Sequence, residues 1–194
     1  MEEVNKFGDG ISWEEHMHHI IKDEDIILHG EDKKSDLVSR ILKYAKGTNL
    51  IDCGCHMGRW HKFFIGAGFV YTGVDQSKEI IEYCKENYPY LAHKFVLSML
   101  WDMEFKEEFD IAISIAVLQH NKLDEKKRIL PKIYNALKPG GVFFMTESTI
   151  EASNVTQLSR NDWLALVEGV GFTFKESWHT NELGIEDHYI FVKE

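Results

Sequence analysis

Apolar residues along this chain form short runs of strand character that alternate with segments of helical spacing. The strand-like runs are residues 50–53, 69–75, 95–102, 109–120 and 142–147. The run 109–120 is apolar almost throughout, as expected of a parallel strand that is covered on both faces. Alternating strands and helices with short breaks, and no internal repeat or linker, predict one α/β domain over residues 1–194, with a parallel sheet wrapped by helices.

Capping residues and apolar spacing indicate where the helices lie. Ser12-Trp13-Glu14-Glu15 is a capping box that opens a helix through about Lys22. Asp32 or Ser35 begins a second helix, which Gly47 closes. Further helices are predicted from Arg59 to Gly66, from Ser77 to about Asn87, and around Ile129, Ile133 and Leu137.

Composition narrows the class of protein. The formal net charge is −10, and the sequence shows no row of lysine and arginine residues that would offset this charge locally. Nucleic-acid binders must neutralise phosphates with basic groups, so this chain is not expected to bind nucleic acid. No apolar stretch approaches the ~20 residues that span a bilayer, and the acidic start lacks the pattern of a secretory signal. We therefore expect a cytoplasmic protein that does not enter membranes, and we expect the charged run 125–128 to be the solvated face of a helix.

The three cysteines, Cys53, Cys55 and Cys84, offer no disulfide framework and are expected to be reduced thiols. Cys53 and Cys55 form a Cys-x-Cys pair that could bind a soft metal ion, but no second pair accompanies it. The histidines His16, His18 and His19 lie too close together on a predicted helix to point to one face. No metal site is therefore predicted.

A turn that contains two glycines has the features of a ligand-binding site. The apolar strand Leu50-Ile51-Asp52-Cys53 runs into Gly54-Cys55-His56-Met57-Gly58, and the acidic residue Asp75 ends the next strand. Glycine admits turn conformations that are closed to other residues and lets a ligand lie against the main chain. The helix expected at 59–66 would direct its N-terminal amides toward that ligand. This arrangement is typical of a nucleoside-cofactor site.

The spacing of the glycines separates two cofactor families. The dinucleotide pattern Gly-x-Gly-x-x-Gly, started at Gly54, meets His56 and Arg59 at its second and third glycine positions. The pattern Asp-x-Gly-x-Gly-x-Gly fits at Asp52, Gly54 and Gly58 and fails only at His56. Here the chain resembles the class I S-adenosylmethionine-dependent methyltransferases, and the resemblance continues in order from about Leu37 to the C-terminus.

Later segments carry the same resemblance. Phe95 to Asp102 is similar to the third strand and adenine loop of that family, and Phe109 to His120 is similar to its fourth strand. Lys138-Pro139-Gly140-Gly141 and the run that follows resemble its fifth strand, and Ser159 to Phe172 resembles its last helix and the entry to strand six. The resemblance implies a doubly wound, seven-stranded, mostly parallel sheet in the order 3-2-1-4-5-7-6, with helices on both faces.

The resemblance also implies the cofactor, S-adenosyl-L-methionine, and the residues around it. Asp75 would accept hydrogen bonds from the ribose hydroxyls, because a carboxylate offers two acceptor oxygens. Backbone amides and apolar side chains of the adenine loop would meet the base, although the acid that many relatives carry near Met99 is missing. The expected cofactor-binding residues are Asp52, Gly54, Cys55, His56, Gly58, Asp75, Gln76, Ser98, Met99, Leu100 and Ser114.

Asp52, Asp75, Ser114, His120 and Glu147 should gather beyond the carboxyl ends of the strands, where doubly wound folds bind ligands. His120 is the candidate general base, since imidazole titrates near neutral pH; packing of the loop is its alternative. Glu147 could orient an amine or hydroxyl of the acceptor, or be a surface carboxylate. Residues 1–35 are expected to be a helical lid or cap, in which Trp13 and His16 would face the substrate; packing against the domain is the alternative.

Three functions stay open from the sequence. The favoured one is a methyltransferase that acts on a small molecule or a protein side chain. A second is a regulatory module that binds S-adenosylmethionine without catalysis, because His56 occupies the middle glycine position. The third, a nucleotide-dependent oxidoreductase, is disfavoured by the glycine spacing. The sequence identifies neither the acceptor nor the oligomeric state.

Overall fold

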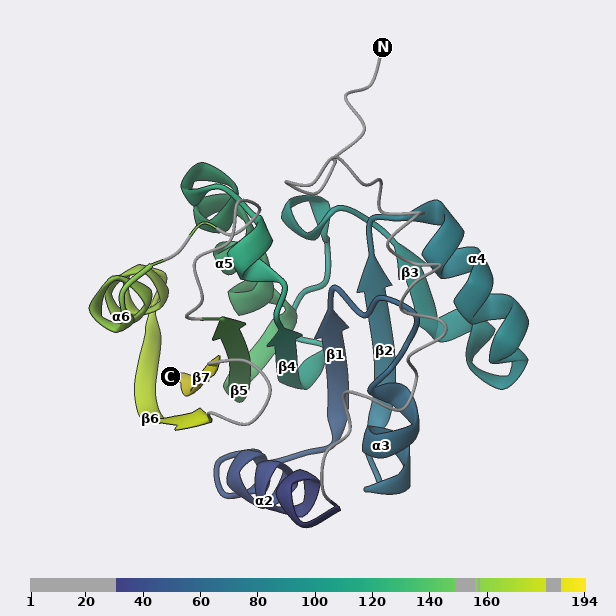
Figure 1. Cartoon of the computed structure of the whole chain (residues 1–194), viewed down its shortest axis with the longest axis horizontal. Coiled ribbons are helices and arrows are strands. Elements are labelled where there is room, and N and C mark those ends of the chain that lie inside the picture. Colours follow the sequence, from purple (N-terminus) through teal and green to yellow (C-terminus); the bar gives the residue numbers. More distant parts are fainter. Residues whose placement is uncertain (1–30, 149–155, 157, 181–185) are drawn as a thin grey trace.

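A computed structural model describes residues 31–148, 156, 158–180 and 186–194 of the chain (Figure 1). The elements in chain order are α2 (Glu31–Leu42), β1 (Asn49–Cys53), α3 (His61–Gly66), β2 (Val70–Asp75), α4 (Lys78–Asn87), η1 (Pro89–Lys94), β3 (Phe95–Leu97), η2 (Leu100–Asp102), β4 (Phe109–Ile115), η3 (Leu118–His120), α5 (Leu123–Ala136), β5 (Leu137–Ser148), α6 (Arg160–Glu168), β6 (Phe172–Thr180) and β7 (Glu186–Lys193). The helix predicted after Ser12 and the lid predicted at 1–35 lie mostly outside these residues.

The strands form one seven-stranded sheet in the order β3-β2-β1-β4-β5-β7-β6. Strands β1 to β5 pair in parallel, whereas β7 runs antiparallel to both β5 and β6. The predicted fold class and strand order are confirmed. The order reverses between β1 and β4, and this switch point is where a doubly wound sheet leaves a crevice beyond its carboxyl ends.

The sheet separates two apolar layers. On one face, Ile41 of α2, Phe64 of α3 and Ile80 of α4 pack against Leu50 of β1 and Ile113 of β4. On the other face, residues of α5, α6 and η2 pack against the sheet, among them Ile129, Ile133, Trp163, Val167 and Leu100. Alternate residues of each strand therefore enter opposite layers, which explains why β4 reads as apolar throughout.

Capping chemistry fixes the starts of α4 and α6, and the start of α4 after Ser77 is as predicted. The Ser77 hydroxyl accepts the Ile80 amide at 3.2 Å at the start of α4, and Ser159 caps α6 by accepting the Asp162 amide at 3.2 Å. Several boundaries differ from the prediction, among them the end of α2, which lies at Leu42 and not next to Gly47. Helix α3 begins only at His61, because the preceding residues are still in the turn, and Leu137 is the first residue of β5 rather than part of a helix.

The expectation that residues 125–128 form a solvated face is wrong at Lys126, whose side chain is fully buried. Its ammonium donates to the carbonyls of Asn121 and Thr156 and lies 5.4 Å from the centre of the Trp163 ring. Burial lowers the pKa of Lys126 to about 8. This lysine therefore ties the segment after β5 to the start of α5.

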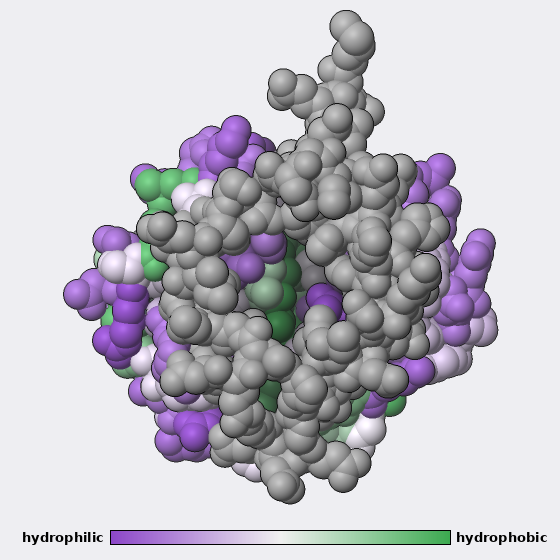
Figure 2. Space-filling model, in the orientation of Figure 1, coloured by the Kyte–Doolittle hydropathy of each residue, from purple (hydrophilic) through white to green (hydrophobic). Residues whose placement is uncertain are grey.

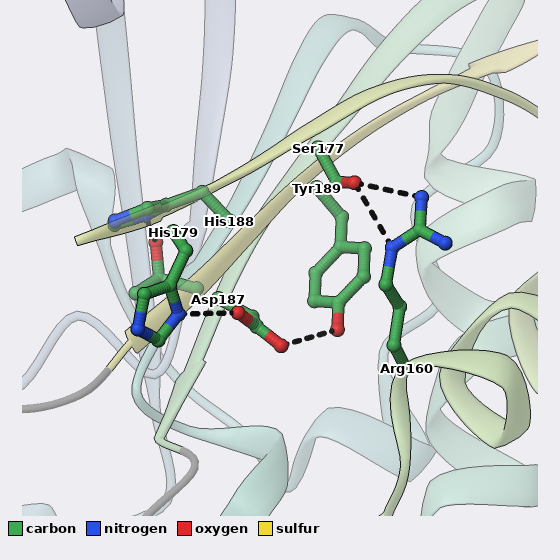
Figure 3. A network of polar contacts seen from close by, with 7 residues as sticks. Arg160, Ser177, His179, Asp187, His188 and Tyr189 are labelled. Atoms are coloured by element: carbon green, nitrogen blue, oxygen red, sulfur yellow. Dashed lines mark hydrogen bonds and ion pairs between the residues drawn. The ribbon is translucent and has the colours of Figure 1, made fainter.

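Aromatic stacking joins the β6–β7 pair to the rest of the sheet. The rings of His188, Trp178 and Phe144 contact one another in pairs, with centres 5.0 Å (Trp178–His188), 6.1 Å (Phe144–His188) and 5.9 Å (Phe144–Trp178) apart. The Nδ1 of His188 is 2.8 Å from the Thr146 hydroxyl. The Arg40 guanidinium of α2 lies 4.5 Å above the Trp178 ring. Figure 3 shows His188 beside a second polar group, in which His179 Nδ1 contacts Asp187 at 2.7 Å and the Tyr189 hydroxyl donates to the same carboxylate at 3.2 Å.

Acid is expected to destabilise the fold through His188. Burial lowers the pKa of His188 from 6.5 to about 4, so between these pH values the unfolded chain binds a proton that the folded chain does not. The contribution of this site to the free energy of unfolding should fall by about 2 kcal/mol from pH 7 to pH 5. Urea unfolding of the wild type and of His188→Phe at both pH values measures this difference. An equal fall in the two proteins would contradict it.

Candidate active site

The glycine turn leaves β1 at the switch point of the sheet. Gly54 and Gly58 have φ values of +84° and +72°, and His56 between them has φ +49°. The amides of Gly54 and Cys55 both donate to the Val74 carbonyl, at 2.8 and 2.9 Å. The turn is thus bonded to the end of β2, where the acidic residue Asp75 stands.

Asp75 contacts the turn directly. Its Oδ2 accepts the His56 amide at 3.0 Å, and its Oδ1 accepts the Ser77 amide at 2.9 Å. Burial raises the pKa of Asp75 above its ordinary value, and the amides of Ser77, His56 and Gln76 oppose that shift. Each carboxylate oxygen has a second lone pair, so the group can still accept two hydroxyls of a bound ribose.

Asp52 is a second carboxylate at this edge and is almost fully buried. The Tyr71 hydroxyl donates to its Oδ2 at 2.5 Å. Burial raises the pKa of Asp52 to about 7, and the nearby Asp75 charge acts in the same direction. Tyr71 was not predicted to contact Asp52. The alternation of side chains along β2, which directs Tyr71 to the face that holds Asp52, is the sequence feature that indicates this contact.

Packing accounts for the two glycines. A Cβ placed at Gly54 would lie 2.6 Å from Val117 Cγ2, and one at Gly58 would lie 3.3 Å from the Tyr88 ring. The turn is therefore pressed against the segment after β4 on one side and against aromatic side chains on the other. Gly54 and Gly58 let the turn adopt its shape without displacing these neighbours.

The segment after β3 lies on the far side of Asp75. The Ser98 amide donates to the Asp75 carbonyl at 3.0 Å, so it is already engaged and is not available to a base. Leu97 and Met99 expose 49% and 40% of their surfaces, whereas Leu100 is buried in the core. Exposed apolar side chains next to Asp75, the acid expected to bind ribose, suit the faces of an adenine ring. Leu97 was not among the expected residues, and Gln76, which was, is exposed beside Asp75.

The ends of β4 and β5 form the opposite wall. The Ser114 side chain is fully buried, and among the described residues its hydroxyl has no hydrogen-bond partner. Glu147 is also buried, and its Oε2 accepts the Gln119 amide at 2.7 Å. The alternative that Glu147 is a surface carboxylate is therefore wrong. His120 follows at the end of η3, half-buried, with its Nε2 3.3 Å from the Gln119 side-chain amide.

Figure 2 shows a few apolar residues near the centre of the view, with hydrophilic residues beside them. Trp13 and His16, the expected substrate residues of the lid, lie outside the described residues. Within the part of the chain that is described, no group of three or more His, Cys, Asp and Glu side chains is arranged to hold a metal ion. In the same part, no helix is long and apolar enough to cross a membrane.

Comparison with known proteins agrees with this geometry. A family model described as "Methyltransferase domain" matches residues 50–141. The chain is similar to an uncharacterized methyltransferase of Synechocystis, with 24% identity over 74% of this chain and 76% of that protein. It is similar to a ubiquinone biosynthesis O-methyltransferase of Nitrobacter winogradskyi, with 30% identity over 61% of this chain and 44% of that protein. Several curated relatives are thus matched over only about half of their length.

Solved structures share the fold. A TehB-like S-adenosylmethionine-dependent methyltransferase from Corynebacterium glutamicum superposes with a TM-score of 0.72 at 18% identity, over 94% of this chain and 96% of its own. A magnesium protoporphyrin IX methyltransferase from Synechocystis, solved with bound S-adenosylmethionine, gives a TM-score of 0.67 at 16% identity, over 84% and 79% of the two chains.

Replacing Gly54 with alanine is expected to damage both the fold and the site. The positive φ alone costs an alanine about 1 to 2 kcal/mol, and the overlap with Val117 should bring the loss to about 2 to 5 kcal/mol. Gly68→Ala is the matched control, because Gly68 has φ +91° and a Cβ there would meet nothing within 4 Å. Urea unfolding should show the larger loss for Gly54→Ala. Equal losses would refute the packing explanation.

Proposed function

Because this chain belongs to the class I S-adenosylmethionine-dependent methyltransferases, we propose that it transfers the sulfonium methyl group of that cofactor to a small molecule or, as a second possibility, to a protein side chain. The hydrogen bond between the His56 amide and the Asp75 carboxylate is the observation that carries the proposal. It brings the glycine turn and the ribose-binding candidate together at the switch point of the sheet.

The residues present fit the cofactor. Asp75 would accept the two ribose hydroxyls, and Leu97 and Met99 would cover the adenine. Asp52 would balance the ammonium group of the methionine moiety once its carboxyl is ionised. Its pKa of about 7 lies close enough to neutral for a neighbouring cation to favour the charged form. The buried Ser114 hydroxyl supplies one further polar contact at the end of β4.

When bound, the cofactor supplies an electrophilic methyl group whose bond to sulfur breaks as the acceptor atom bonds to carbon. The protein's task is to hold the acceptor in line with that bond and to exclude water. An acceptor that loses a proton on methylation needs a base, and His120 is the candidate, at the end of η3. Glu147, held by the Gln119 amide, would orient an amine or a hydroxyl of the acceptor.

The net charge of the chain and the names of similar proteins support a small-molecule acceptor. The net charge of −10 disfavours nucleic acid, whose phosphates would be repelled. The relatives include a protein named for ubiquinone biosynthesis and a human thiol S-methyltransferase, which is 26% identical over 77% of this chain and 66% of its own length. Both names describe methylation of molecules smaller than a protein or a nucleic acid.

Cofactor binding tests the proposal. Calorimetric titration should show binding of S-adenosylmethionine and S-adenosylhomocysteine but not of NAD. Asp75→Ala should weaken binding by about 1 to 3 kcal/mol, because hydrogen bonds to a charged acceptor are lost. Asp124→Ala, in the first turn of α5, is the control and should bind like the wild type. Binding of NAD alone, or an unchanged affinity in Asp75→Ala, would overturn the assignment.

Turnover tests the role of His120. Once an acceptor is found by screening with radiolabelled cofactor, His120→Ala should reduce kcat by about 10²-fold or more, the usual contribution of a general base. Its affinity for S-adenosylhomocysteine should change little. His93→Ala, at an exposed histidine of η1, serves as the control. Full activity in His120→Ala would reject the base role.

A further inference from the structure

His56 occupies a backbone conformation that side chains disfavour. Its φ of +49° lies in the left-handed region, where the methyltransferase pattern has a glycine. A residue stays in such a conformation only when its surroundings hold it there. The contacts of the His56 peptide groups are therefore informative.

Two thiols meet at one of these peptide groups. Cys55 Sγ and Cys84 Sγ both donate to the His56 carbonyl, at 3.5 and 3.4 Å. Cys55 belongs to the turn itself, whereas Cys84 reaches it from α4, and both side chains are buried. Gly73 of β2 leaves space for the Cys55 thiol, because a Cβ at this position would lie 2.8 Å from Cys55 Sγ.

The same residue is held from its other side. The His56 amide donates to Asp75 Oδ2 at 3.0 Å, on the strand adjacent to β1. Rotation of the His56 backbone toward the ordinary right-handed region would turn the carbonyl away from the thiols and the amide away from Asp75 together. The thiol contacts and the carboxylate contact therefore depend on one conformation.

We propose that Cys84, together with Cys55, is a positioning residue for the cofactor. The two thiols hold the His56 carbonyl and thereby keep the His56 amide on Asp75. The outer lone pairs of the Asp75 carboxylate are then left to the ribose hydroxyls. This inference rests on the proposed function and extends it to Cys84 of α4, which lies outside the glycine turn. It also accounts for a histidine at the middle glycine position without loss of the site.

Thiols suit this role chemically. A buried carbonyl needs a donor, and a protonated thiol supplies one without bringing a charge into the core. The neighbouring Cys84 thiol and burial raise the pKa of Cys55 well above its ordinary value, so this thiol keeps its proton at neutral pH. A thiolate would have no proton to donate.

The cysteines themselves provide a matched set of variants. Cys84→Ala removes one donor, whereas Cys53→Ala removes an equally buried thiol of β1 that, within the described part of the chain, makes no hydrogen bond to the His56 carbonyl. Calorimetry with S-adenosylhomocysteine should give about a 3- to 10-fold weaker Kd for Cys84→Ala, the usual value of one hydrogen bond. Cys53→Ala should differ from the wild type by less than about twofold. Equal losses in the two variants would refute the positioning role.

Two further variants distinguish positioning from a general loss of packing. Cys84→Ser keeps a donor and should bind within about threefold of the wild type, even if Cys84→Ala proves too unstable to purify. In the Asp75→Ala background, Cys84→Ala should cost less than about twofold, because the group that it positions is gone. Full additivity of the two substitutions would overturn the proposal.

A measurement without cofactor keeps this inference separate from the proposed function. Amide hydrogen exchange at His56, followed by NMR in the free protein, should be about tenfold faster in Cys84→Ala than in Cys53→Ala. Equal exchange would refute the positioning role even if the cofactor binds. Faster exchange together with no binding of S-adenosylhomocysteine by the wild type would refute the proposed function and leave the structural link intact.

Discussion

The proposed cofactor site depends on one contact, the hydrogen bond from the His56 amide to the Asp75 carboxylate. It joins the turn after β1 to the end of β2 by a bond between a main-chain donor and a buried acid. The bond exists because the backbone at residue 56 is left-handed, and the neighbouring glycines let the turn reach that shape against Val117 and Tyr88. In the proposed function, a local backbone constraint would thus determine where the Asp75 carboxylate meets the cofactor.

The two walls of the site are built differently. The wall formed by the ends of β1, β2 and β3 is held in place by short hydrogen bonds and tight packing, as expected of a surface that binds one invariant cofactor. The wall formed by the ends of β4 and β5 carries Glu147, and His120 follows at the end of η3. The buried Lys126 donates to the carbonyls of Asn121, which precedes α5, and of Thr156, which follows β5 in the chain. Acceptor specificity would therefore be set by loops on a rigid support.

Much of the fold could be predicted from the sequence because periodicity and capping are local signals. The apolar run that begins at Phe109 indicated β4, and the cap Ser77 indicated the start of α4. Long-range contacts leave no such signal. A charged run gave no indication that Lys126 would be buried, and nothing adjacent in the sequence showed that Cys84 would reach the turn. The strained conformation of His56 was visible only as a departure from a glycine pattern.

A crystal structure of the protein with S-adenosylhomocysteine tests the central claim most directly. We predict that both ribose hydroxyls will donate to the Asp75 carboxylate while the His56 amide stays bonded to its Oδ2. A nucleoside bound elsewhere, or a His56 peptide turned so that its amide leaves Asp75, would contradict this account.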